Sequence, residues 1–130
     1  MVVGANLAKE GLFTVEERLA MLREVTADLP NVSVDKFTGL LVDFCRARGV
    51  SAIVKGLRAV SDFEYEMEMA QMNYRLAEIE TLFMTANPLY SFLRSSLVRE
   101  IAAYGGNVAP LVPPAVEAQL RAKLGSSGAG

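Results

Sequence analysis

The sequence predicts an α/β fold whose strands form a parallel sheet. Short apolar runs of strand length alternate with longer segments whose apolar residues recur at helical spacing, in the order strand, helix, strand, helix, strand, helix, strand, helix, helix. A helix between successive strands is the connection that parallel neighbours need, and such crossovers are right-handed. The length of 130 residues and the hydrophobic content of 52% suit a single domain, which we place at residues 1–124.

Composition disfavours several classes of function. The net charge of -2 and the mixing of cations with acids leave no basic face, which argues against nucleic-acid binding. The sequence has no histidine and a single cysteine, so soft-ligand metal sites, histidine-based catalytic dyads and an internal disulfide are excluded. That cysteine, Cys45, lies in an apolar setting and is predicted to pack in the core. No apolar run is long enough to cross a membrane, and the N-terminus lacks the basic start of a signal peptide, so we expect a cytoplasmic protein.

The first half of the chain predicts two strand–helix pairs. Thr14 and Glu17 have the spacing of a capping box and open the first amphipathic helix. Pro30 turns the chain after that helix, and Gly49 is a candidate left-handed stop for the second one. The expected bounds are residues 2–7 and 32–34 for the strands, and residues 15–29 and 40–48 for the helices.

The third strand, predicted at residues 52–54, is followed by two cations. The tetrapeptide Lys55-Gly56-Leu57-Arg58 is expected to leave the carboxyl end of a strand that is buried on both faces. Because ligands of open α/β sheets bind outside the carboxyl ends of strands, Lys55 and Arg58 are candidates for binding an anion. A solvated loop with two ordinary surface cations is an equally good interpretation of this spacing by itself.

The third helix is predicted over residues 61–76, with Ser61 and Glu64 as its capping box. Glu66 and Asn73 lie two helical turns apart on one side of it, with a small residue between them, so this polar pair could line a pocket. Flexible methionines fill gaps in cores and subunit contacts more often than they bind ligands. We interpret three residues of this helix in that way: Met67, Met69 and Met72.

The last third of the chain adds one strand and two helices. The apolar run at residues 80–85 predicts another buried strand, ended by Asn87-Pro88. Ser95 and Ser96 precede a helix over residues 97–104, whose free backbone N–H groups and dipole would attract an anion. Serine is also a favoured N-cap residue without any such function. Pro113-Pro114 starts the last helix, which runs to residue 124, and residues 125–130 are typical of a flexible linker.

Several of these motifs occur together and in a fixed order. The longest is KGLRAVSDFEYE at residues 55–66, which continues as MAQMN at residues 69–73. The others are GLFTVEER at 11–18, GLLVDF at 39–44, YSF at 90–92 and SSLVRE at 95–100. The combination resembles the bacterial phosphopantetheine adenylyltransferase family, and the likeness covers nearly all of residues 2–124.

The resemblance implies a Rossmann-like nucleotidyltransferase fold and a transferase of coenzyme A biosynthesis. Such enzymes transfer the adenylyl group of ATP to 4′-phosphopantetheine, giving dephospho-coenzyme A and pyrophosphate. They are cytoplasmic, use Mg2+ bound mainly through the ATP phosphates, and usually assemble as homohexamers. Coenzyme A is then a further expected ligand, and neither nucleic acid nor a membrane is an expected partner.

The resemblance also implies the site residues. Phosphopantetheine would contact Lys9, Leu41 and Lys55, and its pantetheine arm would be bordered by Met72 and Asn73. ATP would contact Gly56, Leu57, Arg58 and Glu66, and its phosphates would lie in the segment of Tyr90, Ser91, Phe92, Leu93, Arg94, Ser95 and Ser96. Arg94 stands where the family more often has a serine. The reaction needs no covalent intermediate, because a phosphate oxygen attacks the α-phosphorus in line and positioning with charge stabilisation supplies the rate.

One part of the family pattern has no counterpart in residues 1–130. It is the first strand and helix with the motif T/S-F-D-P-x-T-x-G-H, so the catalytic histidine of the family is not assigned here. Because that strand is central in the family, we expect an incomplete domain whose neighbouring strand edges are unpaired. Three alternatives stay open: an adenylyltransferase whose natural chain begins earlier, a non-catalytic fragment or assembly module of a split enzyme, and a related cytidylyltransferase.

Overall fold

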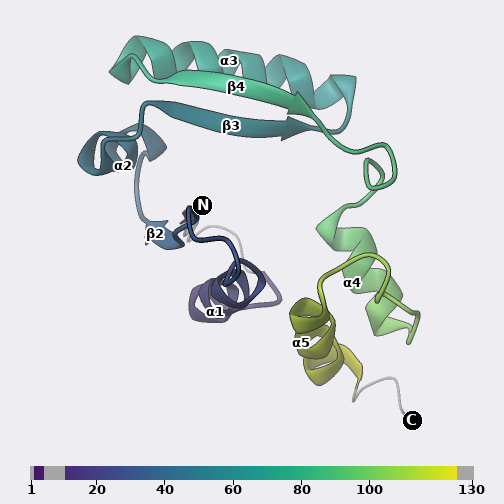
Figure 1. Ribbon diagram of the computed structural model, residues 1–130. Helices are drawn as coiled ribbons and strands as arrows, with labels where there is room; N and C mark the ends of the chain where they lie inside the picture. Colours follow the sequence, from purple (N-terminus) through teal and green to yellow (C-terminus); the bar gives the residue numbers. More distant parts are fainter. Residues whose placement is uncertain (1, 5–10, 126–130) are drawn as a thin grey trace. The chain divides into compact units, whose positions relative to one another are not determined.

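The computed structural model describes residues 2–4 and 11–125 (Figure 1). The chain divides into two compact units, one joining residues 1–36 to residues 93–130 and the other made of residues 37–92. The described strands form two pairs, β1 with β2 and β3 with β4. The elements are β1 (Val2–Gly4), α1 (Val15–Val25), β2 (Asp35–Phe37), α2 (Leu41–Arg48), β3 (Ala52–Leu57), α3 (Val60–Ala77), β4 (Glu80–Thr85), α4 (Ser95–Ala103) and α5 (Pro114–Leu124).

The second unit is built on a parallel pair of strands. β3 and β4 run in the same direction, with Ala52 opposite Glu80 at the start of the pairing. The helix α3 connects them and lies along one face of the pair (Figure 1). There Phe63 packs edge-on against Phe83, with the ring centroids 5.7 Å apart. The parallel pairing through a helical crossover confirms the predicted α/β class.

A small core of this unit forms around α2. Val42, Cys45 and Ile79 are each at most 3% exposed, and Val50 and Ile53 pack against them. The predicted packing role of Cys45 is therefore confirmed. Burial raises the pKa of its thiol, which keeps the sulfur protonated at neutral pH and unreactive as a nucleophile.

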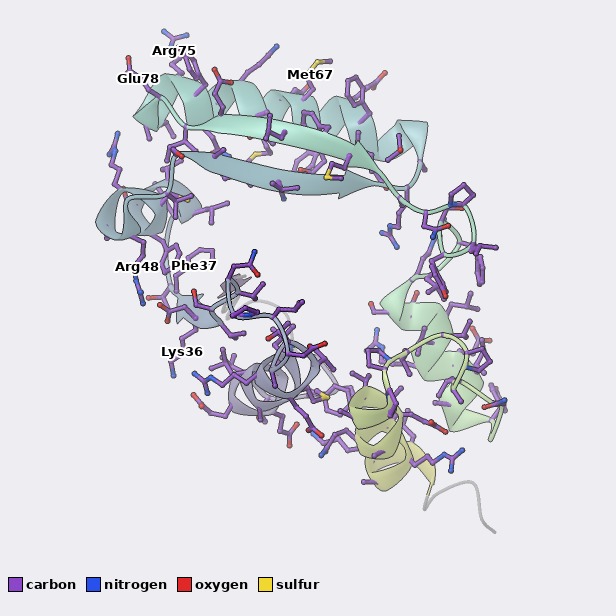
Figure 2. The ribbon with its side chains drawn as sticks, viewed as in Figure 1. Lys36, Phe37, Arg48, Met67, Arg75 and Glu78 are labelled. Carbon is purple, nitrogen blue, oxygen red and sulfur yellow. The ribbon has the colours of Figure 1, made fainter. Side chains whose placement is uncertain are left out.

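The strands of the second unit are buried on one face only. Val54, Leu82 and Met84 project to the other face and are 62%, 56% and 62% exposed. The prediction of strands covered on both faces is therefore wrong for these described residues, because α3 covers one face alone. The methionine interpretation is corrected in the same way: Met67 points away from the strands (Figure 2) and is 39% exposed, so it is not a core residue. A subunit contact for it stays a prediction.

The first unit packs α1, α4 and α5 around a second core. Val98, Val108 and Leu120 are buried there, and Leu12 and Phe13 pack against them from the turn before α1. The last helix has Pro113 as its N-cap, begins at Pro114 within the predicted Pro113-Pro114 start, and ends at Leu124 as predicted. Residues from both ends of the sequence therefore share one core.

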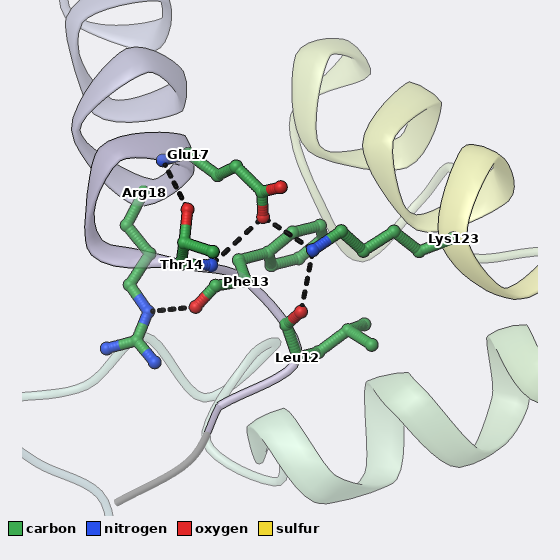
Figure 3. A network of polar contacts seen from close by, with 6 residues as sticks. All are labelled: Leu12, Phe13, Thr14, Glu17, Arg18 and Lys123. Atoms are coloured by element: carbon green, nitrogen blue, oxygen red, sulfur yellow. Dashed lines mark hydrogen bonds and ion pairs between the residues drawn. The ribbon is translucent and has the colours of Figure 1, made fainter.

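A polar network fixes the start of α1 to α5 (Figure 3). Lys123 Nζ lies 2.6 Å from Glu17 Oε2, donates to the Leu12 carbonyl oxygen at 2.8 Å, and sits 5.1 Å from the centroid of the Phe13 ring. The predicted capping box is confirmed, because Glu17 N donates to Thr14 Oγ1 and Thr14 N donates to Glu17 Oε2. Glu17 thus serves the helix cap and the ion pair together.

The network gives the first unit a pH dependence. The hydrogen bond from Lys123, followed by the one from Thr14 N–H, lowers the pKa of Glu17 below its ordinary value. A carboxyl with a lowered folded-state pKa stabilises the fold above its unfolded pKa, and this stabilisation is lost as the pH falls through the lowered value. We expect wild type to unfold at higher urea than Glu17→Gln at neutral pH, with the difference shrinking in acid. A constant difference across this range would contradict the assignment.

The first two predicted strands have different bounds in the structure. β1 covers Val2–Gly4, and the rest of the expected strand at residues 5–7 lies outside the described residues. The second strand was expected at 32–34 but occupies Asp35–Phe37, because pairing with β1 rather than local alternation selects the strand residues.

Three predicted helices also have different bounds. α1 ends at Val25 instead of residue 29, where Thr26 closes the last turn by donating from Oγ1 to the Leu22 carbonyl oxygen at 2.6 Å. α3 begins at Val60 with Ala59 as N-cap, so the predicted capping box that started it at residue 61 is wrong. α4 begins at Ser95 instead of residue 97. The second helix agrees to within one residue and ends at Arg48, and its C-cap Gly49 has a φ of 66°, which confirms the predicted left-handed stop.

Candidate functional site

The second unit contains a cavity of about 210 Å³ between the start of α2, the middle of β3 and one side of α3. Its wall is mainly apolar with a few polar groups, which is the usual character of a small-molecule site. The lining residues are Leu40, Leu41, Val42, Lys55, Tyr65, Glu66, Met69, Ala70, Met72, Asn73, Leu76 and Thr81.

The polar groups of this cavity come from α3 and β3. Glu66 and Asn73 line it together with Ala70, so the predicted polar pair with a small residue between is confirmed as a pocket wall. Asn73 is only 8% exposed. Lys55 Nζ lies 3.3 Å from Glu66 Oε2, and the two side chains are 40% and 23% exposed. The cavity therefore holds a cation that already has an anionic partner.

The apolar wall can hold an extended, uncharged chain. Met69, Met72 and Leu76 follow one another at helical spacing along α3, and Leu41 faces them from the first turn of α2. Met69 and Met72 line the cavity and are 39% and 51% exposed, so they are not core residues, while a subunit contact for them stays a prediction. Flexible thioether side chains adapt to ligands of irregular shape.

The predicted pair of cations is divided between two places. Lys55 and Leu57 lie inside β3, not in a loop after it, because the strand runs three residues beyond its expected end. Arg58 follows the strand and lines a second cavity of about 310 Å³ at the carboxyl ends of β3 and β4. Gly56 sits between them with no atom within 4 Å of where a Cβ would be. The other residues of the second cavity are Leu57, Ala59, Phe63 and Thr85.

The expected phosphate-binding segment, residues 90–96, includes the point in the sequence where the second unit ends and the first unit resumes. Tyr90, Ser91 and Phe92 close the second unit in a turn where Ser91 Oγ donates to the Pro88 carbonyl oxygen at 3.2 Å. Leu93 and Arg94 are the first residues of the second stretch of sequence in the first unit, residues 93–130. Arg94 is the N-cap of α4, and its side chain makes no capping hydrogen bond. Ser95 and Ser96 are therefore the first two helical residues, and the interpretation of serine as an N-cap is wrong.

The remaining predicted site residue, Lys9, lies outside the described residues. Across residues 2–4 and 11–125, no group of three or more acidic or cysteine side chains could hold a metal ion. None of the helices in the described part of the chain is both long and apolar enough to span a bilayer.

Sequence reasoning missed several lining residues. Tyr65 lies one turn before Met69 and on the same side of α3, so helical periodicity could have identified it. Thr85 pairs with Leu57 across the two strands, a relation that depends on the register of β3 and β4. Thr81 Oγ1 is buried without a hydrogen-bond partner in the described structure, and no sequence signal marks it.

Comparison with known proteins assigns the class. Residues 2–101 match the family model described as cytidylyltransferase-like. The chain is 65% identical over 123 residues to a phosphopantetheine adenylyltransferase from Thermobifida fusca, a match that covers 95% of this chain and 75% of that protein. A phosphopantetheine adenylyltransferase from Streptomyces coelicolor is 59% identical over 124 residues, covering 95% of this chain and 78% of its own length. The parallel strands, the cavities at α3 and these matches define a nucleotidyltransferase of the cytidylyltransferase-like class.

Within that class the chain belongs to the phosphopantetheine adenylyltransferase family. A relative from Frankia casuarinae with the same name is 58% identical over 128 residues and is covered over 79% of its length. Family membership confirms the resemblance found in the sequence motifs.

Proposed function

We propose that this protein transfers the adenylyl group of ATP to 4′-phosphopantetheine, giving dephospho-coenzyme A and pyrophosphate. The proposal rests mainly on the relatives, because proteins named for this activity are 58–65% identical to the chain over the aligned residues. The cavity beside α3 supports it, since this cavity combines an apolar wall with a cation. The reaction is a step of coenzyme A biosynthesis.

Phosphopantetheine would occupy the cavity of about 210 Å³. Its pantetheine arm is flexible and largely uncharged, and would lie against Leu41, Met72 and Asn73. The buried Asn73 amide can both donate and accept hydrogen bonds, which suits the amide groups of that arm. Its phosphate would approach Lys55, the cation of the cavity wall, and we propose Lys9 as a second contact.

ATP would use the second cavity and the chain segments predicted by resemblance. Arg58 and the neighbouring Gly56 and Leu57 are proposed nucleotide contacts, and Phe63 adds an aromatic surface beside Arg58. Glu66 stays a further proposed ATP contact by resemblance, although it lines the cavity beside α3. At the start of α4, backbone N–H groups without intrahelical partners are suited to phosphate oxygens. The proposed segment that contacts the phosphates is Tyr90, Ser91, Phe92, Leu93, Arg94, Ser95 and Ser96.

The reaction would proceed by direct displacement. A phosphate oxygen of phosphopantetheine attacks the α-phosphorus of ATP, the new P–O bond forms, and the bond to pyrophosphate breaks. By the family resemblance we propose that Mg2+ would arrive on the ATP phosphates, where it would neutralise part of their charge. A cytoplasmic location, a homohexameric assembly and a preceding strand–helix unit in the natural protein stay proposals from the family resemblance.

A direct assay tests the reaction. The protein is incubated with ATP, Mg2+ and phosphopantetheine, and dephospho-coenzyme A and pyrophosphate are measured together. Equimolar formation of both products is expected, whereas product formation from CTP in preference to ATP would favour a cytidylyltransferase. Absence of products under conditions where both substrates bind would favour the non-catalytic alternative, and reading the coding sequence upstream of Met1 for the FDP motif tests the earlier start.

Ligand-induced stabilisation provides a second test. A ligand that binds only the folded state stabilises it by about 2.7 kcal/mol at one hundred times its dissociation constant. We therefore expect ATP and coenzyme A each to raise the melting temperature of the 130-residue protein in a concentration-dependent way. CTP is the control nucleotide, and a larger shift with CTP than with ATP would contradict the proposed substrate.

A further inference from the structure

The ion pair between Lys55 and Glu66 joins two residues that the family resemblance assigns to different substrates. Lys55 is a proposed phosphopantetheine contact, and Glu66 is a predicted ATP contact. In the structure both side chains line the same cavity, with the ammonium nitrogen 3.3 Å from the carboxylate oxygen. Arg58, another predicted ATP contact, lines the other cavity instead. Glu66 therefore shares a cavity with the proposed phosphopantetheine contact Lys55 and not with Arg58.

The scaffold holds Glu66 where it can act on Lys55. Glu66 is part of the 18-residue helix α3, and Phe63, almost one turn earlier, packs against Phe83 of β4. Lys55 extends from β3, the strand paired with β4, and its register partner is Phe83. The backbone positions of the two charges are thus fixed by packing, while the long lysine side chain, 40% exposed, keeps room to move.

An entering phosphate meets both charges of this pair. It is attracted by the ammonium and repelled by the carboxylate, and among the described residues that line the cavity Lys55 is the only cation. A phosphate that binds Lys55 must therefore compete with Glu66 for the ammonium group. A neutral ligand meets no such competition.

We propose that Glu66 is a positioning residue for Lys55 that the phosphate of phosphopantetheine displaces. In the empty cavity the carboxylate holds the ammonium group at the wall, and in the complex the ammonium group turns to the phosphate. This assignment rests on the proposed function and deepens it. Its consequence is selectivity: a phosphate dianion can replace the single charge of Glu66 at Lys55, whereas a weaker, singly charged group competes poorly.

The assignment is tested by titration calorimetry with phosphopantetheine and with pantetheine, which lacks the phosphate. Exposed and half-exposed ion pairs are weak, so Glu66→Gln is expected to tighten phosphopantetheine binding about two- to five-fold. Pantetheine binding is expected to stay unchanged. The matched control is Glu117→Gln on α5. The Glu117 side chain is 19% exposed and its Oε1 lies 2.5 Å from a guanidinium nitrogen of Arg121, so the variant removes a comparable ion pair. It is expected to change neither affinity.

A double-mutant cycle shows whether Glu66 acts through Lys55. The tightening caused by Glu66→Gln is expected to shrink or vanish when Lys55 is replaced by methionine. An equal or larger tightening in that background would overturn the assignment, because Glu66 would then merely repel the phosphate. Unchanged phosphopantetheine affinity in Glu66→Gln would also overturn it while leaving the proposed function intact. Absence of phosphopantetheine binding to wild type would instead overturn the proposed function and this assignment with it.

Discussion

Replacing Lys55 with alanine is expected to weaken phosphopantetheine binding by about 1.5–3 kcal/mol, or roughly 10- to 150-fold, because a charge-assisted contact to the phosphate is lost. ATP binding is expected to change much less. Lys55 lines the cavity beside α3, whereas the proposed nucleotide contact Arg58 lines the cavity at the strand ends. Both dissociation constants can be measured on the same preparation by calorimetry.

The reciprocal variant is Arg58→Ala, for which ATP binding is expected to weaken more than phosphopantetheine binding. Lys36→Ala is the matched control, because it removes a lysine whose Nζ pairs with Glu16 at 2.7 Å in the first unit. That control is expected to leave both affinities unchanged. Equal losses of affinity for both ligands in Lys55→Ala and in Arg58→Ala would refute the assignment of one cation to each ligand.

The largest stability effect is expected for Leu120→Ala. Leu120 is 2% exposed and packs with Val98 and Val108 in the core of the first unit. Truncation removes buried methyl groups and leaves a cavity, so the free energy of unfolding should fall by about 2–5 kcal/mol. Urea denaturation followed by circular dichroism gives this difference.

Leu89→Ala is the control for that measurement, since Leu89 is 71% exposed and its truncation should change the stability by less than about 0.5 kcal/mol. Similar losses in the two variants would mean that the buried cluster does not supply the stability of the first unit. If only part of the circular dichroism signal of Leu120→Ala were lost at lower urea, the two units would instead unfold separately.

Local signals predicted the elements that depend on local chemistry. The capping box of Thr14 and Glu17, the left-handed Gly49 and the start of α5 at Pro114 were all found from a few neighbouring residues. The strand Glu80–Thr85 was also found with its bounds, because its apolar run ends before Pro88. These features need no information from distant parts of the chain.

Features that depend on pairing could not be predicted in this way. The alternation at 32–34 is as typical of a strand as the sequence that forms β2, and only the partner β1 distinguishes them. In the same way the run at 52–54 gave no reason to continue through Lys55, but the pairing with β4 extends β3 to Leu57. The strand exposure was mispredicted because an apolar run does not reveal how many faces are covered.

The candidate site was predictable only where it depends on spacing within one helix. The helical period alone placed Glu66, Ala70 and Asn73 on one wall, and the structure confirms it. The contact between Lys55 and Glu66 joins a strand to the crossover helix, so it depends on how α3 packs over β3. The motifs nevertheless pointed to the correct family, because a series of motifs in order is more specific than any one contact.

The arrangement of the two units sets an order of events during synthesis. The second unit is one continuous segment, residues 37–92, whereas the first needs residues from both ends of the chain. Glu17 and Lys123 are 106 positions apart, so the network that fixes α1 to α5 closes only when the last helix has left the ribosome. Until then Leu12 and Phe13 lack the core that later covers them. The segment around Leu12 and Phe13 therefore gains its packing partners only after the residues of α5 have been synthesised.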